Sequence, residues 1–175
     1  ESRFLHLGDL TDADIERINA ECECVVLPMA NNFRVGFNLM GNLTAFVRRL
    51  KIPCVVMGVG LQADSAADIQ QGFPFDDSTR AFVDAVLDHS ALLGLRGELT
   101  GEYLKKLGYA VTYARNYTDV DDKIIAKANQ LGVPADEYAA KMIEDINAVM
   151  EKFHVDDPDL WLKATENIQN IIDFV

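Results

Sequence analysis

The chain has 175 residues, 49% of them hydrophobic, and a formal net charge of −12. This length fits one domain, or one domain with an appendage, and the apolar fraction is enough for a sizeable core. The acidity is spread along the chain, with 10 basic and 15 acidic residues in 1–110 and 6 and 13 in 111–175. Because affinity for polyanions comes largely from Lys and Arg neutralising phosphates, we expect neither a nucleic-acid partner nor binding to an anionic membrane.

Cysteine usage indicates the cellular compartment. The three cysteines, Cys22, Cys24 and Cys54, are an odd number with no signal peptide before them, so we expect a cytoplasmic protein in which they act as small core residues. A zinc site would need more ligands than the widely separated histidines supply, and we expect no metal and no cofactor. No run of about 18 apolar residues is present, which argues against a membrane span.

The first part of the chain predicts alternating strands and helices. Residues 3–7 suggest an edge strand, and Thr11 with Asp14 three residues later suggests a capped helix start. Apolar runs at 24–29 and 52–57 predict buried strands, and residues 39–50 between them have helical spacing. The Gly58–Gly60 turn that follows is compatible with backbone amides facing a ligand, or with turn geometry alone.

The same alternation continues to about residue 122. Residues 64–78 predict a long loop or lid, and Ser78 a helix cap. A third buried strand is expected at 91–95 and a fourth at 111–113, each preceded by a helical stripe. The repeated βα pattern predicts a Rossmann-like three-layer α/β domain over residues 1–122, with a mostly parallel sheet of four or five strands.

Short polar residues follow the fourth strand, at Asn116, Thr118, Asp119, Asp121 and Asp122. Ligands bind at the carboxyl ends of strands in open α/β sheets, so we expect this cluster near the polar residues that follow the earlier strands. The aspartates have two interpretations, a Mg²⁺ or Ca²⁺ site and capping of the next helix. Capping is favoured, because consecutive aspartates point in different directions on any regular backbone.

Beyond residue 122 the apolar spacing is helical throughout. The pattern predicts a helix near 124–128, a long amphipathic helix over 138–153 and a further segment that starts at Pro158. Residues 123–175 are therefore expected to form a helical segment packed on the α/β domain. The methionines and Phe153 of the long helix are interpreted as core rather than as a cofactor site.

Residues 14–109 resemble the polysaccharide pyruvyl transferase family. The resemblance rests on residues 25–34 (VVLPMANNFR), 50–62 (LKIPCVVMGVGLQ) and 89–100 (HSALLGLRGELT). Members of that family have two-domain, glycosyltransferase-type folds and move a pyruvyl group from phosphoenolpyruvate onto a sugar. The resemblance implies an anion-binding role for Arg96, for which pairing with Glu98 or Glu102 is an equal alternative. The family's second domain has no counterpart here.

Residues 107–175 resemble cysteinyl-tRNA synthetase. The match is carried by residues 113–129 (YARNYTDVDDKIIAKAN), and residues 156–158 (DDP) and 164–168 (ATENI) continue it in order. The resemblance implies that this segment ends the first half of a nucleotide-binding fold, with Thr118 near the aminoacyl site. The HIGH and KMSKS motifs and the zinc ligands that select cysteine are absent from the sequence.

The two resemblances meet near residues 105–109, and the chain looks like a recombinant of two Rossmann-like pieces. We therefore expect a folded α/β scaffold of chimeric or designed origin, without a complete active site and without catalytic turnover.

A second hypothesis is a pyruvyl-transferase-like enzyme or donor-binding subunit that takes phosphoenolpyruvate or a sugar nucleotide. The third is a synthetase fragment or a helix-mediated interaction module that self-associates through its C-terminal helices. The candidate ligand-binding residues are Asn31, Asn32, Gly58, Gly60, Arg96, Asn116 and Thr118.

Overall fold

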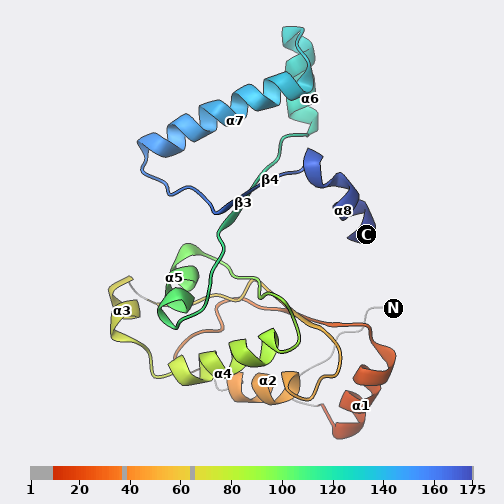
Figure 1. The fold of residues 1–175 in the computed structure, drawn as a ribbon, viewed down its shortest axis with the longest axis vertical. Helices are drawn as coiled ribbons and strands as arrows, with labels where there is room; N and C mark the ends of the chain where they lie inside the picture. The colour runs from red at the N-terminus through yellow and green to blue at the C-terminus, as the bar shows by residue number, and fades with distance from the viewer. Residues whose placement is uncertain (1–9, 37–38, 64–65, 175) are drawn as a thin grey trace. The chain divides into compact units, whose positions relative to one another are not determined.

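The computed structural model describes residues 10–36, 39–63 and 66–174, which divide into two units (Figure 1). Unit 1 is Glu1–Val111 and unit 2 is Thr112–Val175. The division falls before the predicted boundary at residue 122, because the strand near residue 115 pairs inside unit 2. The edge strand expected at residues 3–7 lies outside the described residues.

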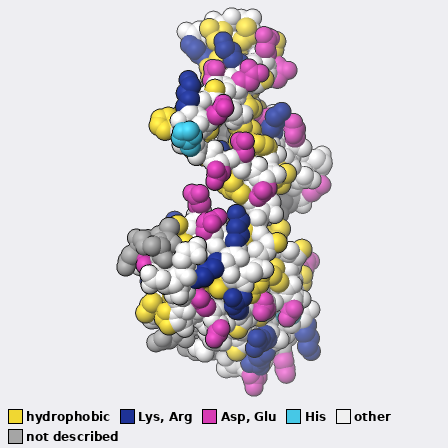
Figure 2. Space-filling model, turned by 60° about the vertical axis from the view of Figure 1, so that its left-hand side comes forward, with side chains coloured by type: hydrophobic (Ala, Val, Ile, Leu, Met, Phe, Trp, Pro, Cys, Tyr) yellow, Lys and Arg dark blue, Asp and Glu magenta, His cyan; other side chains and the backbone are white. Residues whose placement is uncertain are grey.

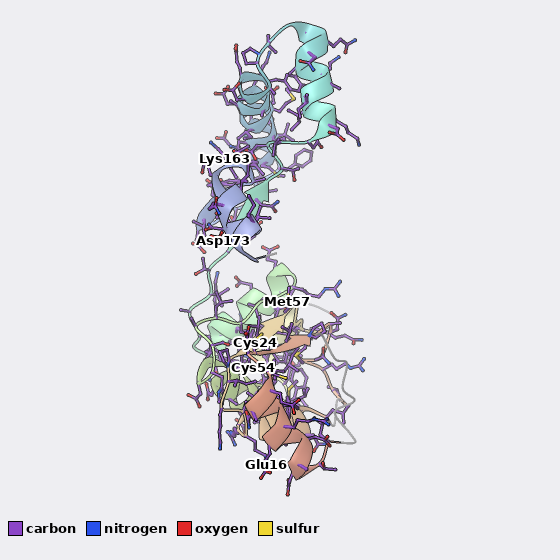
Figure 3. The ribbon with its side chains drawn as sticks, turned by 90° about the vertical axis from the view of Figure 1, so that its right-hand side faces the viewer. Glu16, Cys24, Cys54, Met57, Lys163 and Asp173 are labelled. Atoms are coloured by element: carbon purple, nitrogen blue, oxygen red, sulfur yellow. The ribbon has the colours of Figure 1, made fainter. Side chains whose placement is uncertain are left out.

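Unit 1 is built on two parallel strands, β1 (Val25–Pro28) and β2 (Cys54–Met57), with Val25 opposite Cys54. Figure 3 labels Cys54 and Met57, the first and last residues of β2, and Cys24, which precedes β1. Alternate side chains of β2 are buried and exposed, so one face of the pair is covered. The third strand expected at 91–95 is reduced to a parallel bridge between Leu95 and Val59 on the other edge of β2.

The described residues of unit 1 also form five helices, and α2 lies beside α4 (Figure 1). The helix bounds are α1 Asp12–Glu21, α2 Met40–Val47, α3 Ala66–Gln71, α4 Asp76–Leu87 and α5 Glu98–Lys106. The predicted capping box is confirmed, because the Thr11 side chain accepts from the Asp14 amide and Asp14 accepts from the Thr11 amide.

Two local expectations in unit 1 are wrong. The stretch expected to be a loop over 64–78 contains α3 and the first turn of α4. Ser78 does not cap α4, because the helix already begins at Asp76 and the Ser78 hydroxyl donates to the Phe75 carbonyl at 2.8 Å. Two acidic residues, Asp76 and Asp77, occupy the first turn instead, where they favour the helix dipole.

The core of unit 1 is a single cluster in which aromatic rings meet edge to face. Phe33, Phe82 and Tyr103 are fully buried, and the Phe33 ring centroid lies 6.5 Å from that of Phe82 and 6.2 Å from that of Tyr103. The Tyr103 hydroxyl donates to Asp76 at 2.7 Å, so its polar atom is satisfied inside the core. This core fixes the strand ends of unit 1.

Unit 2 pairs β3 (Ala114–Tyr117) with β4 (Leu160–Lys163) in parallel, and Arg115 lies opposite Trp161. The predicted fourth strand therefore starts at Ala114 rather than at residue 111. Residues 160–163, expected to belong to a helical segment, form a strand because their backbone pairs with β3. The α/β class with parallel pairing is confirmed, but the described residues form two two-stranded sheets instead of one sheet of four or five strands.

The helices of unit 2 bury little apolar surface. Their bounds are α6 Asp122–Leu131, α7 Ala135–Lys152, the 3₁₀ turn η2 Thr165–Asn167 and α8 Ile168–Phe174. Helix α6 packs on α7 (Figure 1), and the buried residues among those described are Ala128, Ala139 and Pro158. The core prediction for the long helix is wrong at Phe153, which is 76% exposed.

Pro158 does not start a helix but lies in the irregular segment before β4. Among the residues that the structure describes, no helix is both long and apolar enough to cross a bilayer.

Candidate functional site

A cleft of about 330 Å³ opens in unit 2 at the carboxyl end of β3. Its polar rim comes from the segment that joins β3 to α6, and its apolar floor comes from α6 and α7. The lining residues are Tyr117, Thr118, Asp119, Asp121, Lys123, Ile124, Tyr138, Ala139, Met142, Ile143 and Ile146. The volume lies within the range of small-molecule sites, and the carboxyl end of a parallel strand is where such sites form in α/β proteins.

Each rim aspartate has a partner within the protein. Asp121 is the N-cap of α6, and its Oδ1 accepts from the Ile124 amide at 2.8 Å. Asp119 accepts from the Thr165 amide at 3.1 Å and from the Thr165 hydroxyl. The capping interpretation is confirmed for Asp121, and across residues 10–36, 39–63 and 66–174 no group of three His, Cys, Asp or Glu side chains is arranged to hold a metal ion.

The charge of Asp119 is stabilised by these hydrogen bonds. Partial burial raises the pKa of this carboxyl, but the bonds from the Thr165 side chain and amide lower the pKa by more, so that it lies below its ordinary value. Asp119 therefore stays ionised at neutral pH and joins the end of β3 to the residue that follows β4.

Contacts of Tyr117, at the end of β3, with α7 and with β4 stabilise the floor of the cleft. The Tyr117 hydroxyl donates to Asn147 Oδ1 on α7 at 2.6 Å, and the Tyr117 ring stacks on Trp161 with centroids 4.6 Å apart. Lys123 supplies the cation among the lining residues. An apolar floor with a polar rim suits a ligand that has a flat apolar face and hydrogen-bonding edges.

The structure places one of the two predicted residues of this region in the cleft. Thr118 lines it, whereas Asn116 lies on the other face of β3, opposite Leu162 and exposed. Sequence reasoning missed the α7 contribution, exemplified by Tyr138 and Ile146. The signal was the helical stripe of the long helix, which was interpreted as core.

The unit 1 candidates meet one another at the carboxyl ends of its strands. A Cβ on Gly60 would lie 2.9 Å from Arg96 Cγ and 3.1 Å from Asn31 Oδ1, so these three residues are in contact. Gly58 has φ +74°, and Asn32 Oδ1 accepts from the Ala30 amide at 2.8 Å. Close packing and turn geometry therefore account for both glycines, and a ligand role for this group stays a prediction.

A second cleft, of about 490 Å³, lies in unit 1 and contains none of the candidates named from the sequence. It lies beyond the Phe33–Leu61 bridge, where two parallel segments end. Its lining residues are Arg34, Val35, Gln62, Ala63, Asp68, Gln71, Gly72 and Phe73. Four of these residues, Asp68, Gln71, Gly72 and Phe73, fall in the stretch that the sequence predicts to be a long loop or lid.

Comparison with known proteins finds sequence similarity in the second half of the chain. Residues 95–175 match a family model described as the catalytic domain of class I tRNA synthetases (C). A cysteine–tRNA ligase of Desulfotalea psychrophila is 47% identical over 73 residues, and one of Geobacter metallireducens is 48% identical over the same length. Each match covers 42% of this chain and 15% of the relative.

A chloroplastic/mitochondrial cysteine–tRNA ligase of Arabidopsis thaliana gives a similar match, 42% identical over 73 residues, which is 13% of its length. These findings support the predicted resemblance to cysteinyl-tRNA synthetase. They give no support to the pyruvyl transferase resemblance or to a chimeric or designed origin.

The expectation of no nucleic-acid partner is wrong, because the matching family and relatives are tRNA synthetases and tRNA ligases. Net charge misled the prediction because it averages over the whole chain, whereas contacts to RNA depend on where the cations lie. On the face drawn in Figure 2, Asp and Glu side chains are scattered among Lys and Arg rather than gathered in one patch. Residues 95–175 are thus similar to the catalytic domain of class I cysteine-specific tRNA synthetases, and the chain spans about 15% of the length of the curated relatives it matches.

Proposed function

We propose that residues 95–175 are part of a cysteine–tRNA ligase catalytic domain, and that the chain acts on tRNA through unit 2. The observation that carries the proposal is the sequence identity of 42–48% over 73 residues with the three ligases described above. The family match over residues 95–175 includes the β3–α6 region, whose residues form the rim of the cleft.

The geometry of unit 2 supports this assignment. The cleft opens at the carboxyl end of a parallel strand, the place where nucleotides and small substrates bind in α/β proteins. Thr118, which the resemblance places near the aminoacyl site, lines it together with Lys123. We infer that this cleft is part of a substrate site, with Thr118 as a hydrogen-bonding group and Lys123 as a cation.

Catalysis needs more than this unit provides. Activation of an amino acid by ATP requires groups that hold the phosphates and the developing charge, and neither the HIGH nor the KMSKS motif occurs in the sequence. We therefore expect cysteine-dependent ATP–pyrophosphate exchange by this chain alone to stay at background, while tRNA binding persists.

The test is a binding titration of the full chain with fluorescently labelled tRNA. A cysteine-accepting tRNA transcript should bind with saturation and more tightly than a transcript that accepts another amino acid. Equal affinity for the two transcripts, or no binding at tens of micromolar protein, would overturn the proposal. Thr118→Val, which keeps the shape of the side chain and removes its hydroxyl, is the site variant, and Asn116→Ala on the opposite face of β3 is its matched control.

A further inference from the structure

The two-stranded sheet of unit 2 has two chemically different faces. Paired residues of parallel strands share a face, so Arg115 and Trp161 lie on one side with Tyr117 and Lys163. Tyr113, which precedes β3, joins them because the Arg115 guanidinium lies over its ring, 5.2 Å from the centroid. We call these five residues the aromatic–basic face. The other face carries Ala114, Asn116, Leu160 and Leu162, with no charge and no ring.

We propose that the aromatic–basic face binds unpaired RNA, with bases stacked beside its rings and Arg115 and Lys163 neutralising phosphates. The proposal rests on the proposed function for its biological RNA, which would be an unpaired segment of tRNA. Flat aromatic side chains interleaved with cations are the arrangement by which proteins bind single strands. A duplex hides the faces of its bases and offers nothing for the rings to stack on.

The rings of this face are already ordered against one another. The planes of Tyr117 and Trp161 are nearly parallel, with an interplanar angle of 6°, so that one ring stacks on the other, and the Arg115 guanidinium carbon lies 5.3 Å from the centroid of the Trp161 ring. Arg115 Nε donates to the Tyr113 hydroxyl at 3.0 Å, which fixes the guanidinium beside the Tyr113 ring. Tyr113 itself is 43% exposed, so part of its surface is open to a base.

Arg115 and Lys163 are positioned to contact an RNA strand that runs along the sheet. From Tyr113 to Tyr117 the backbone rises about 13 Å, at roughly 3.3 Å per residue, which is enough for several nucleotides stacked at about 3.4 Å each. Lys163 lies at the far end of β4 and is labelled in Figure 3. Its ammonium pairs with Glu166 at 3.1 Å on the surface, a contact of little energy that a phosphate can replace.

The carboxylates near this face have partners. Glu166 pairs with Lys163, and Asp159 accepts from the Tyr113 amide at 2.7 Å. The acidic excess of unit 2 therefore does not prevent a local contact with RNA, although it makes the contact sensitive to salt.

Trp161 is the only tryptophan in the sequence, so its emission reports on this face directly. The experiment titrates the full chain with a single-stranded RNA octamer, with the blunt duplex of the same sequence and with tRNA. We expect the octamer to quench Trp161 emission and to bind about tenfold more tightly than the duplex. If Arg115 and Lys163 each neutralise one phosphate, a plot of log affinity against log salt concentration should have a slope of about −1.4. Removing either cation should reduce the magnitude of this slope by about 0.7.

Arg115→Gln and Lys163→Gln should each weaken octamer binding about threefold to tenfold, and Tyr113→Ala at least about fivefold through lost stacking. Asn116→Ala, on the other face of the same strand, should bind like the parent. Circular dichroism checks that each variant is folded. If Arg115→Gln disturbs the sheet, Lys163→Gln still tests the role of a cation, because the Lys163 side chain makes only a surface contact.

The outcomes separate this proposal from the proposed function. If tRNA binds with cysteine preference but the three variants bind as tightly as the parent, the face is excluded and the proposed function stands. If the octamer quenches Trp161 but tRNA shows no preference, the proposed function fails and the face stands as an RNA site. No quenching by the octamer, or equal affinity for octamer and duplex, would overturn the inference.

Discussion

Asp119 and Asp121 stand two residues apart and perform different tasks. Asp121 caps α6, a local role within three residues of chain. Asp119 reaches Thr165, which is 46 residues away in sequence, and so joins the loops that follow the two paired strands. Both carboxylates belong to the rim of the unit 2 cleft, and their hydrogen bonds fix the rim without a ligand.

Replacing these aspartates tests that assignment. Asp121→Ala should cost about 1 kcal/mol, and Asp121→Asn should be nearly neutral because Asn caps as well as Asp. Asp119→Ala should also cost about 1 kcal/mol through the two lost bonds to Thr165. Denaturant unfolding followed by Trp161 emission measures these changes. A loss as large for Asp121→Asn as for Asp121→Ala would contradict the capping role.

The pH dependence of Asp119 has a definite sign. Its pKa in the folded protein is lowered, so its stabilising contribution is present above the ordinary carboxyl pKa of about 4 and is lost as pH falls through the folded value. Unit 2 should therefore lose stability below about pH 4, and Asp119→Asn should lose less over the same range. Identical acid profiles for the parent and Asp119→Asn would refute this.

The cysteines of unit 1 differ sharply in their surroundings. Cys22 and Cys24 are exposed and Cys54 is fully buried in β2, contrary to the expectation that all three are core residues. Burial, and to a lesser degree the neighbouring Cys24, raises the pKa of the Cys54 thiol to about 11.

A disulfide-exchange reagent at pH 8 should modify two thiols rapidly and the third only after unfolding, because the thiolate is the reacting form. Cys54→Ala is the control and should leave the fast phase unchanged. Three thiols reacting at one rate in the folded protein would show that β2 is not buried as described.

At the scale of elements, β3 and β4 hold unit 2 together through the stack of Tyr117 on Trp161. Such pairs contribute about 0.5–1.5 kcal/mol beyond their buried area. A double-mutant cycle with Tyr117→Leu and Trp161→Leu should give a coupling energy of about 1 kcal/mol in denaturant unfolding. Strictly additive losses would show that the rings do not interact in solution.

Some of these elements could be predicted from the sequence and others could not. The capping box at Thr11 and the cap at Asp121 were predictable, because each involves residues three apart. Strands β1 and β2 were predictable as apolar runs that are short and bounded by turns. Strand β4 was missed because its pairing with β3 is non-local and its two leucines are exposed, so no buried run marks it.

The candidate site was partly predictable for the same reason. The polar residues after β3 were identified from their position, and Thr118 is in the cleft. Its floor was not identified, because an apolar helical stripe such as that of Met142 and Ile146 gives the same pattern whether it packs in a core or lines a cleft. Asn116 does not line the cleft, because a strand alternates its side chains between faces and Asn116 lies on the face opposite Tyr117, so a ligand role for Asn116 stays a prediction.

At the scale of the whole molecule, the two units differ in how much they bury. Unit 1 contains the continuous hydrophobic core, whereas in unit 2 many large apolar side chains of α7 and α8, such as Ile146 and Ile172, remain exposed. Because the free energy of folding depends on buried apolar area, unit 1 should be the more stable unit.

Hydrogen exchange of the intact chain should show this difference. Amides in α2 and α4 are expected to exchange far more slowly than those in α7 and α8, because opening of unit 2 exposes less apolar surface. Comparable protection of α4 and α7 would contradict the expectation that unit 1 is the more stable unit.

The most direct test of the central claim is an amide spectrum of the nitrogen-15-labelled full chain, recorded with and without a cysteine-accepting tRNA. We expect shifted and broadened signals in residues 112–175, above all in the β3–α6 segment and the aromatic–basic face, while the signals of β1, β2 and α4 stay unchanged. Shifts confined to unit 1, or no shifts at saturating tRNA, would contradict the claim that unit 2 carries a synthetase-like function.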